Sequence, residues 1–367
     1  MEKDLGYRKI QCTGRGAYII SLPKGWVQNI GLKKGSEVAF KVRDDSSIIL
    51  IPRKIMERQE LEKPKLKEYC ISAEPKEEIQ SICRKIKSLY VIGADLIHVH
   101  FKGAESASKY KMAINNLAKD ILLGSEIVDE TPNMVTLQIL ISHIEFPLEK
   151  AVRRMAVIAL SANKEAIMAL KNRNPELLQS VVNAYNDVNR LNLYVIRQLK
   201  FGIERNTFKE LGLKTPKEFL AYRIVVNDIK SIAENALNIV NNIITIEKLI
   251  QDQTLFLKEP IDEELYSQVS NFNSLTHQLF EESLKAMFKR DYKHADEIIS
   301  HVESLITREN DLLMLMSSKK LDPNVSAIFR LILDSSRRIM DYTHDVAELT
   351  LNMTIGEISS MQTFKQP

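Results

Sequence analysis

Cysteine, glycine and proline are all scarce in this chain of 367 residues. Its three cysteines, Cys12, Cys70 and Cys83, form no pattern of close pairs with histidines, which excludes a disulfide framework or a zinc knuckle and fits a reducing cytoplasm. Only 12 glycines and 11 prolines are present, too few for a turn-rich all-β fold over most of the length. No apolar run reaches the roughly 18 residues of a membrane span, and the N-terminus lacks an apolar signal core.

Hydrophobic residues make up 44% of the chain and charged residues 27%, the balance of a folded globular protein whose length suits two or three domains. The net charge of +3 is unevenly distributed. Residues 1–54 carry seven lysines and four arginines against five acids, a net charge of +6, which leaves −3 for the remainder. A basic module therefore precedes a mildly acidic body. This asymmetry indicates an anionic partner for the module, with a chance surface bias as the alternative.

The basic module, residues 1–54, predicts two strands, a short helix and two more strands. Alternating apolar residues mark the strands, and proline suits the first position of the helix. The expected strands cover 8–12, 18–22, 37–42 and 48–51, and the helix begins at Pro23 and ends at Gly31. About fifty residues in this order give a single chain too little core, so two copies are expected to interleave and complete each other's sheet.

Three segments of this module, Tyr7–Trp26, Gly31–Val38 and Ser47–Pro52, resemble the AbrB/SpoVT family of swapped-hairpin DNA-binding domains. The resemblance covers about a seventh of the chain. It implies that two chains interlock into a small β-barrel whose hairpins contact double-stranded DNA. In some antitoxin-like relatives such a barrel serves only for dimerisation, which is the alternative here. By position, the resemblance assigns the DNA contacts to Arg8, Lys9, Arg15 and Lys24.

Residues 55–67 are charged and interrupted by Pro64, and we expect a linker there. Residues 68–143 then predict the order βαβαββ, a small α/β segment whose function the sequence does not indicate. His98 and His100 lie on one face of a predicted strand. Because no third ligand is nearby, we interpret them as histidines of the sheet surface rather than as a metal-binding pair.

The rest of the chain has apolar residues at helical spacing throughout. Six long helices are predicted, near 147–172, 175–204, 216–249, 261–290, 292–318 and 322–353. Tyr222–Val240 aligns without gaps to Phe329–Ala347, 107 residues later in the chain. The body is therefore expected to be a tandem of two three-helix units, residues 144–255 and 256–367, neither of which is stable without burying a long face.

The duplicated helices, together with Tyr185–Leu199, resemble the phosphate-uptake regulator family PhoU over about 220 residues. A PhoU-like body behind an AbrB-like module resembles the archaeal homologues of that family. The resemblance implies a mostly α-helical protein that acts in phosphate uptake and phosphate homeostasis. We do not expect an enzyme, because the residues offer no phosphate-binding glycine loop, nucleophile elbow or Cys/His pair.

The PhoU family holds iron or zinc clusters with a Glu/Asp-x-x-x-Asp element on the third helix of each unit. Here the first acid of each element is replaced, by Lys230 before Glu234 and by Arg337 before Asp341. A cation at a ligand position repels a metal and can pair with the acid four residues later, so a polar stripe with internal ion pairs is the favoured interpretation. The alternative is a divalent or iron ion, mainly in the second unit, with candidate ligands Asp341, Asp345, Glu348 and Glu234.

Two functions fit these features. In the first, the module binds DNA as a homodimer and the body senses phosphate status through a ligand or a signalling partner, which makes the chain a transcription regulator. In the second, the body docks on a phosphate ABC transporter or its ATPase and inhibits it, and the module serves only for dimerisation. Salt-dependent DNA binding distinguishes them, because only the first function requires it.

Overall fold

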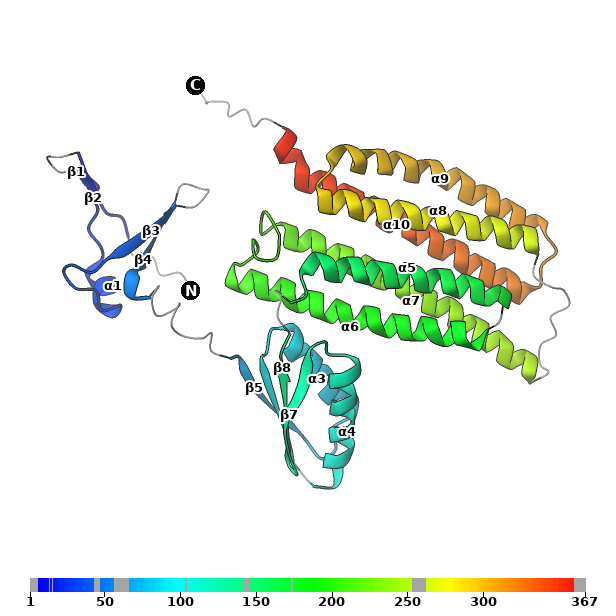
Figure 1. The fold of residues 1–367 in the computed structure, drawn as a ribbon, viewed down its shortest axis with the longest axis horizontal. Coiled ribbons are helices and arrows are strands. Elements are labelled where there is room, and N and C mark those ends of the chain that lie inside the picture. The colour runs from blue at the N-terminus through cyan, green and yellow to red at the C-terminus, as the bar shows by residue number, and fades with distance from the viewer. Residues whose placement is uncertain are drawn as a thin grey trace. The chain divides into compact units, whose positions relative to one another are not determined.

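The computed structural model describes residues 6–12, 14, 16–42, 47–55, 66–102, 104–141, 145–172, 174–252 and 262–359. The chain divides into two compact units, Met1–Leu66 and Lys67–Pro367, and this division falls within the predicted linker (Figure 1). Most of the described residues are helical, as the sequence predicts.

The N-terminal unit has the predicted order of two strands, one helix and two strands. Its elements are β1 (Gln11–Cys12), β2 (Tyr18–Ile19), α1 (Lys24–Asn29), β3 (Val38–Val42) and β4 (Ile48–Pro52). Strand β1 pairs with β2 and β3 with β4, both antiparallel, and within the described residues these two hairpins form separate sheets rather than a closed barrel. Helix α1 buries none of its residues. One copy of this unit therefore has very little core of its own.

The next segment folds as the predicted α/β layer. Its elements are β5 (Glu68–Ala73), α3 (Ile79–Val91), β6 (Leu96–Phe101), α4 (Ala104–Asp120), β7 (Ser125–Thr131) and β8 (Met134–Ile139). The sheet order is β5-β6-β8-β7, with β5 parallel to β6 and the other pairs antiparallel. Helices α3 and α4 share one hydrophobic core with the sheet. Helix α4 leads into β7 through Gly124, whose φ of +69° and contact with Ile141 leave no room for a side chain.

The two histidines of β6 behave as residues of the sheet surface. The Nδ1 atom of His98 lies 3.0 Å from the hydroxyl of Thr136 on β8, within hydrogen-bonding distance. The imidazole of His98 also lies 3.8 Å from the carboxylate of Glu68, while His100 is exposed. A polar sheet face accounts for both side chains.

The body consists of the six predicted long helices, with ends within a few residues of those expected. They are α5 (Leu148–Asn172), α6 (Pro175–Arg205), α7 (Glu218–Gln251), α8 (Glu263–Lys289), α9 (Tyr292–Ser318) and α10 (Pro323–Ile358). Helices α5–α7 pack together as one group and α8–α10 as another, and α7–α10 and α5–α8 contacts join the groups (Figure 1). This is the tandem of two three-helix units that the internal repeat predicts.

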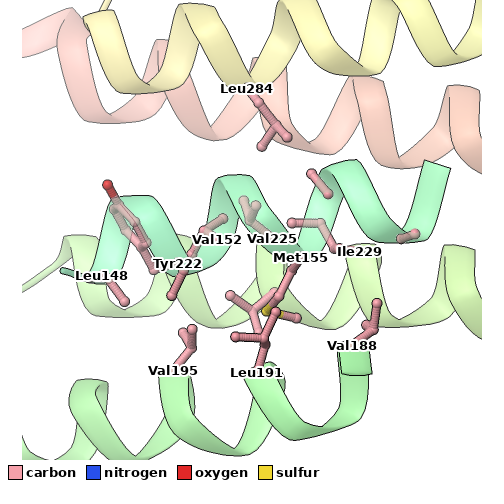
Figure 2. Close-up of a cluster of buried hydrophobic side chains, with 14 of the residues drawn as sticks. Leu148, Val152, Met155, Val188, Leu191, Val195, Tyr222, Val225, Ile229 and Leu284 are labelled. Atoms are coloured by element: carbon pink, nitrogen blue, oxygen red, sulfur yellow. The ribbon is translucent and has the colours of Figure 1, made fainter. Parts of the chain in front are cut away.

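Two hydrophobic cores run through the body, and both draw on helices from each three-helix unit. In the first core, Leu284 of α8 lies above side chains of α5, α6 and α7, among them Met155, Leu191 and Val225 (Figure 2). The second core similarly includes Phe272 of α8 and Ile239 of α7. Each three-helix unit therefore buries its apolar face against the other unit.

Helices α7 and α10 belong to different three-helix units and pack against each other in opposite directions. The side chain of Arg338 on α10 donates to Oδ1 of Asn235 on α7, at 3.3 Å, and Asp345 of α10 acts electrostatically on Asp228 of α7. Because the later residue of α10 faces the earlier residue of α7, the two helices are antiparallel. We refer to this contact between α7 and α10 as the seam.

A buried polar network also links the units. The amide of Asn163 on α5 donates to the hydroxyl of Ser335 on α10 at 2.9 Å. Its oxygen accepts from Asn273 on α8, and Nε2 of His277 lies 2.9 Å from the same oxygen. Burial lowers the pKa of His277 to about 4, so the imidazole is neutral at pH 7 and contributes hydrogen bonds rather than charge. Such a satisfied network favours one relative alignment of α5, α8 and α10.

Arg197 of α6 fixes the α/β layer to the body. Its guanidinium donates to the carbonyl oxygens of Tyr90 and Ala94, at 2.8 and 2.7 Å, where α3 ends and the chain enters β6. It also lies 3.3 Å from the carboxylate of Asp95 and 5.2 Å from the centre of the Tyr90 ring. A second ion pair, between Lys67 and Glu204, joins the same two parts. The α/β layer is thus docked on α6 by a buried cation that bonds to three acceptors of the layer.

Among the described residues, no helix combines the length and the apolarity required to cross a bilayer.

Candidate functional site

The cations predicted to contact DNA lie on the surface of the N-terminal unit. Arg8 and Lys9 are exposed just before β1, and Lys24 is exposed at the first position of α1. Arg15 lies outside the described residues, so its predicted position at the tip of the first hairpin stays a prediction. Further exposed lysines on the same unit, which were not predicted to contact DNA, are Lys33, Lys34, Lys41 and Lys54.

The same unit exposes apolar side chains along its hairpins. Phe40 and Val42 of β3 are 67% and 73% exposed, and Ile48 of β4 is 58% exposed. Val42 pairs with Ile48 in the strand register, so these side chains share one face of the hairpin. On the first hairpin, Ile10 and Tyr18 are also exposed. An isolated two-stranded hairpin is marginally stable in water, so these faces are suited to burial against a second copy.

Both replaced acidic elements of the body form the expected internal ion pairs. On α7 the amine of Lys230 contacts the carboxylate of Glu234, four residues later. On α10 the guanidinium of Arg337 contacts Asp341 at 3.1 Å, again four residues later, and also Glu309 of α9 at 3.1 Å. These contacts raise the pKa of Arg337, the pair with Glu309 most strongly, so its charge is fixed beside Asp341. The carboxylates of Glu234 and Asp341 are therefore each paired with a basic side chain of the same helix.

The remaining candidate ligands gather one turn further along α10. His344, Asp345 and Glu348 each offer a ligand atom within 4.8 Å of the others. Asp345 and Glu348 were predicted ligands, whereas His344 was not. One imidazole and two carboxylates are a donor set that suits zinc or a divalent iron ion, and Glu234 and Asp341 lie outside the cluster.

A buried carboxylate lies near this cluster. Asp228 of α7 is only 6% exposed, and its Oδ2 atom has no hydrogen-bond partner among the described residues. Burial raises the pKa of Asp228 to about 7, and the charge of Asp345 contributes to the same shift. The pKa of Asp345 is raised as well, first by partial burial. The seam thus holds two carboxylates from different three-helix units in mutual repulsion, which a bound cation would relieve.

The charge reversal Lys230→Glu with Arg337→Glu is expected to raise the metal content of the purified protein. It removes the two cations that oppose a metal and restores the acid at both elements, so iron or zinc should rise from below one ion per chain to one or more. Elemental analysis of both proteins measures this directly. His344→Ala in the reversed background is the control and should lower the content again. Several tightly bound ions in the unmodified protein would contradict the ion-pair interpretation.

Two of these features were not predicted from the sequence. Asp228 lies on the apolar side of α7, two residues after the buried Val226, and its partner Asp345 is more than a hundred residues away in the chain. His344 had a local signal, since Glu348 lies four residues after His344 and three after Asp345 on the same helix, and both spacings give neighbouring side chains. It was not predicted as a ligand because the matching position of the internal repeat, 107 residues earlier in the chain, is Leu237.

Comparison with protein families identifies two domains. Residues 13–57 match the family described as antidote-toxin recognition MazE, bacterial antitoxin. Residues 152–243, which comprise most of α5, all of α6 and most of α7, match the PhoU domain. The chain thus carries a MazE/AbrB-like domain at its N-terminus and a PhoU domain in its body, as both resemblances predict. Neither family is an enzymatic one.

Solved structures similar to this chain are also PhoU proteins. The phosphate transport system regulatory protein PhoU from Streptococcus pneumoniae is 16% identical, with a TM-score of 0.45, over 58% of this chain and 96% of its own. PhoU from Pseudomonas aeruginosa is 17% identical, with a TM-score of 0.44, over 57% of this chain and 96% of its own. The comparison with curated proteins gave no match.

Proposed function

We propose that this chain, with its MazE/AbrB-like domain at residues 13–57 and its PhoU domain at residues 152–243, is a transcription regulator of phosphate uptake. The PhoU domain indicates a role in the regulation of phosphate uptake. The finer proposal is that the N-terminal unit binds double-stranded DNA as a homodimer while the body responds to phosphate status. Such a protein acts in the cytoplasm, where the DNA is.

The observation that carries the DNA proposal is the concentration of positive charge in the N-terminal unit. Its net charge of +6 contrasts with −3 for the rest of the chain. Arg8, Lys9 and Lys24 are exposed, so their charges can approach phosphate oxygens. Binding to the phosphate backbone requires such cations and releases counterions, so the proposal predicts a steep dependence on salt.

The exposed apolar hairpin faces support the homodimer. A dimer with two-fold symmetry can contact two half-sites of a DNA duplex. It therefore makes twice as many phosphate contacts as one copy. Interleaving two copies covers the faces of Phe40 and Val42 and keeps the cations outside. The same assembly provides the core that one copy lacks.

Removal of single cations from the N-terminal unit is expected to reduce the salt dependence of DNA binding by the full-length protein. Each of Arg8→Gln, Lys9→Gln, Arg15→Ala and Lys24→Gln should lower the slope of log K against log salt by about one unit, since each removes one cation from a phosphate. Fluorescence anisotropy across a salt series measures this on a random duplex and on upstream DNA of phosphate-transport genes. For Arg15→Ala, a loss of affinity confined to one specific duplex indicates a base contact of about 1–3 kcal/mol.

Lys217→Gln, an exposed cation beside α7 in the body, is the matched control and should leave the slope unchanged. Absence of salt-dependent DNA binding by the unmodified protein would contradict the proposal. That result would favour the accessory function, in which the body docks on a phosphate ABC transporter and the N-terminal unit only dimerises. Co-purification with the transporter ATPase would then be the measurement.

A further inference from the structure

A polar groove of about 650 Å³ lies where the α/β layer meets the body. Its walls are α3 and α4 of the layer and α6 of the body, and each helix contributes one stripe at helical spacing. Ile79, Cys83 and Lys87 mark the stripe on α3, and Asp187 and Arg190 belong to the stripe on α6. The groove has the size of a site for a small organic molecule, and neither matched family domain covers α3 or α4.

The charged groups of this groove have no charged partner among the residues that the structure describes. Lys87 and Arg190 contribute two cations, and Asp120 of α4 and Asp187 contribute two carboxylates. None of the four forms a hydrogen bond or an ion pair with another described residue, and the Nε atom of Arg190 is buried without a partner. Because no described carboxylate neutralises Lys87 or Arg190, their charges remain available to an anionic group in the groove.

The remaining lining distinguishes between kinds of ligand. A bare phosphate ion would gain from Lys87 and Arg190 but would be repelled by Asp120 and Asp187. A ligand that adds hydroxyl and N–H donors to its phosphate satisfies both sets of charges. The amides of Asn116 and Asn186 can bond the edge of a heterocycle, and apolar groups for its face come from Ile79 and Leu117.

We propose that this groove binds a nucleoside monophosphate. Lys87 of α3 and Arg190 of α6 hold the phosphate, because guanidinium and ammonium groups are the usual phosphate partners. Asp120 and Asp187 accept hydrogen bonds from the sugar hydroxyls or the base. The ligand contacts both the α/β layer and α6, so it stabilises the docked arrangement that Arg197 maintains. This site goes beyond the proposed function and does not depend on DNA binding by the N-terminal unit.

The test is calorimetric titration of the full-length protein with AMP, GMP, CMP and UMP, and separately with inorganic phosphate. We expect saturable binding of at least one nucleotide at one per chain, and binding of phosphate at least tenfold weaker. Arg190→Gln, Lys87→Gln and Asp187→Asn should each weaken nucleotide binding tenfold or more. The controls are Lys119→Gln on α4 and Arg205→Gln on α6, which do not line the groove and should bind as the unmodified protein does.

A photoreactive azido analogue of the tightest nucleotide gives a second measurement that needs no variant. Crosslinked peptides should come from α3, α4 or α6, and excess unmodified nucleotide should compete. Three outcomes would overturn the proposal: no saturable binding of any of the four nucleotides, phosphate bound as tightly as the nucleotide, or crosslinks confined to other helices. Equal affinity of the groove variants and the controls would also overturn it.

Discussion

Arg197→Leu is expected to lower the free energy of unfolding of the α/β layer by about 3 kcal/mol. The guanidinium of Arg197 donates to the carbonyl oxygens of Tyr90 and Ala94, and leucine removes both bonds, although the backbone amide of Gly93 still donates to Tyr90. The substitution also leaves Asp95 without its cation, although the backbone amide of Lys67 still donates to that carboxylate. Removing one partner from a group of buried, charged hydrogen bonds lowers the free energy of unfolding by more than those bonds contributed to it. The remaining polar groups stay buried and cannot bond to water instead.

Hydrogen exchange resolved by residue measures this effect best, because the chain has two compact units and need not unfold in a single step. Amides of α3 and β6 should exchange about a hundredfold faster in Arg197→Leu. Arg205→Leu is the matched control, since this arginine is on the same helix but exposed, 4.3 Å from the centre of the Phe201 ring. Equal protection in both variants would show that Arg197 does not hold the layer on α6.

The double substitution Phe40→Asp with Val42→Asp is expected to abolish the homodimer and, with it, DNA binding. Each side chain is about two thirds or more exposed in the single copy, and covering it in a dimer should contribute about 2 kcal/mol. Aspartates in their place would also bring like charges together across the interface. With both chains of the dimer affected, we expect the dissociation constant to rise at least a thousandfold.

Sedimentation equilibrium of the full-length protein tests this, with a mass of twice 42.0 kDa expected for the unmodified protein and of one chain for the variant. Met314→Asp in α9 is a matched control, because Met314 is 72% exposed and belongs to the body. The control should remain dimeric. A monomeric unmodified protein that still binds DNA would contradict the dimer proposal, and a dimer that survives the double substitution would place the interface elsewhere.

Local patterns in the sequence predicted the elements of the fold with few errors. The apolar residues of α5 and α6 recur every three or four positions, and Asn174 and Pro175 give a clear start to α6, where the Asn174 side chain caps the helix. The internal repeat predicted which helices form each unit because a duplicated sequence folds to a duplicated structure. These signals depend on neighbours within a few residues.

Such local patterns could not predict the contacts between segments that are distant in the chain. Nothing around Arg197 distinguishes it from the exposed Arg205 in sequence, since its bonding partners lie in residues 90–95. Asp228 has the same difficulty, because its pKa depends on α10. The groove of Lys87 and Arg190 likewise requires knowing that α3 and α4 dock beside α6. Basic side chains are usually exposed, so the sequence predicts that the proposed DNA-contacting residues lie on the surface. How these side chains are oriented toward a duplex depends on the assembly of two chains.

The seam between α7 and α10 makes the body equivalent to a dimer whose two halves are joined by a peptide chain. Association of its halves is an intramolecular reaction, governed by an effective concentration that the eleven-residue connection between α7 and α8 keeps high. Folding of the body is therefore independent of how much protein a cell contains. Assembly of the proposed N-terminal dimer is bimolecular and follows abundance. A fall in expression would then release the protein from DNA while its helical body stays intact.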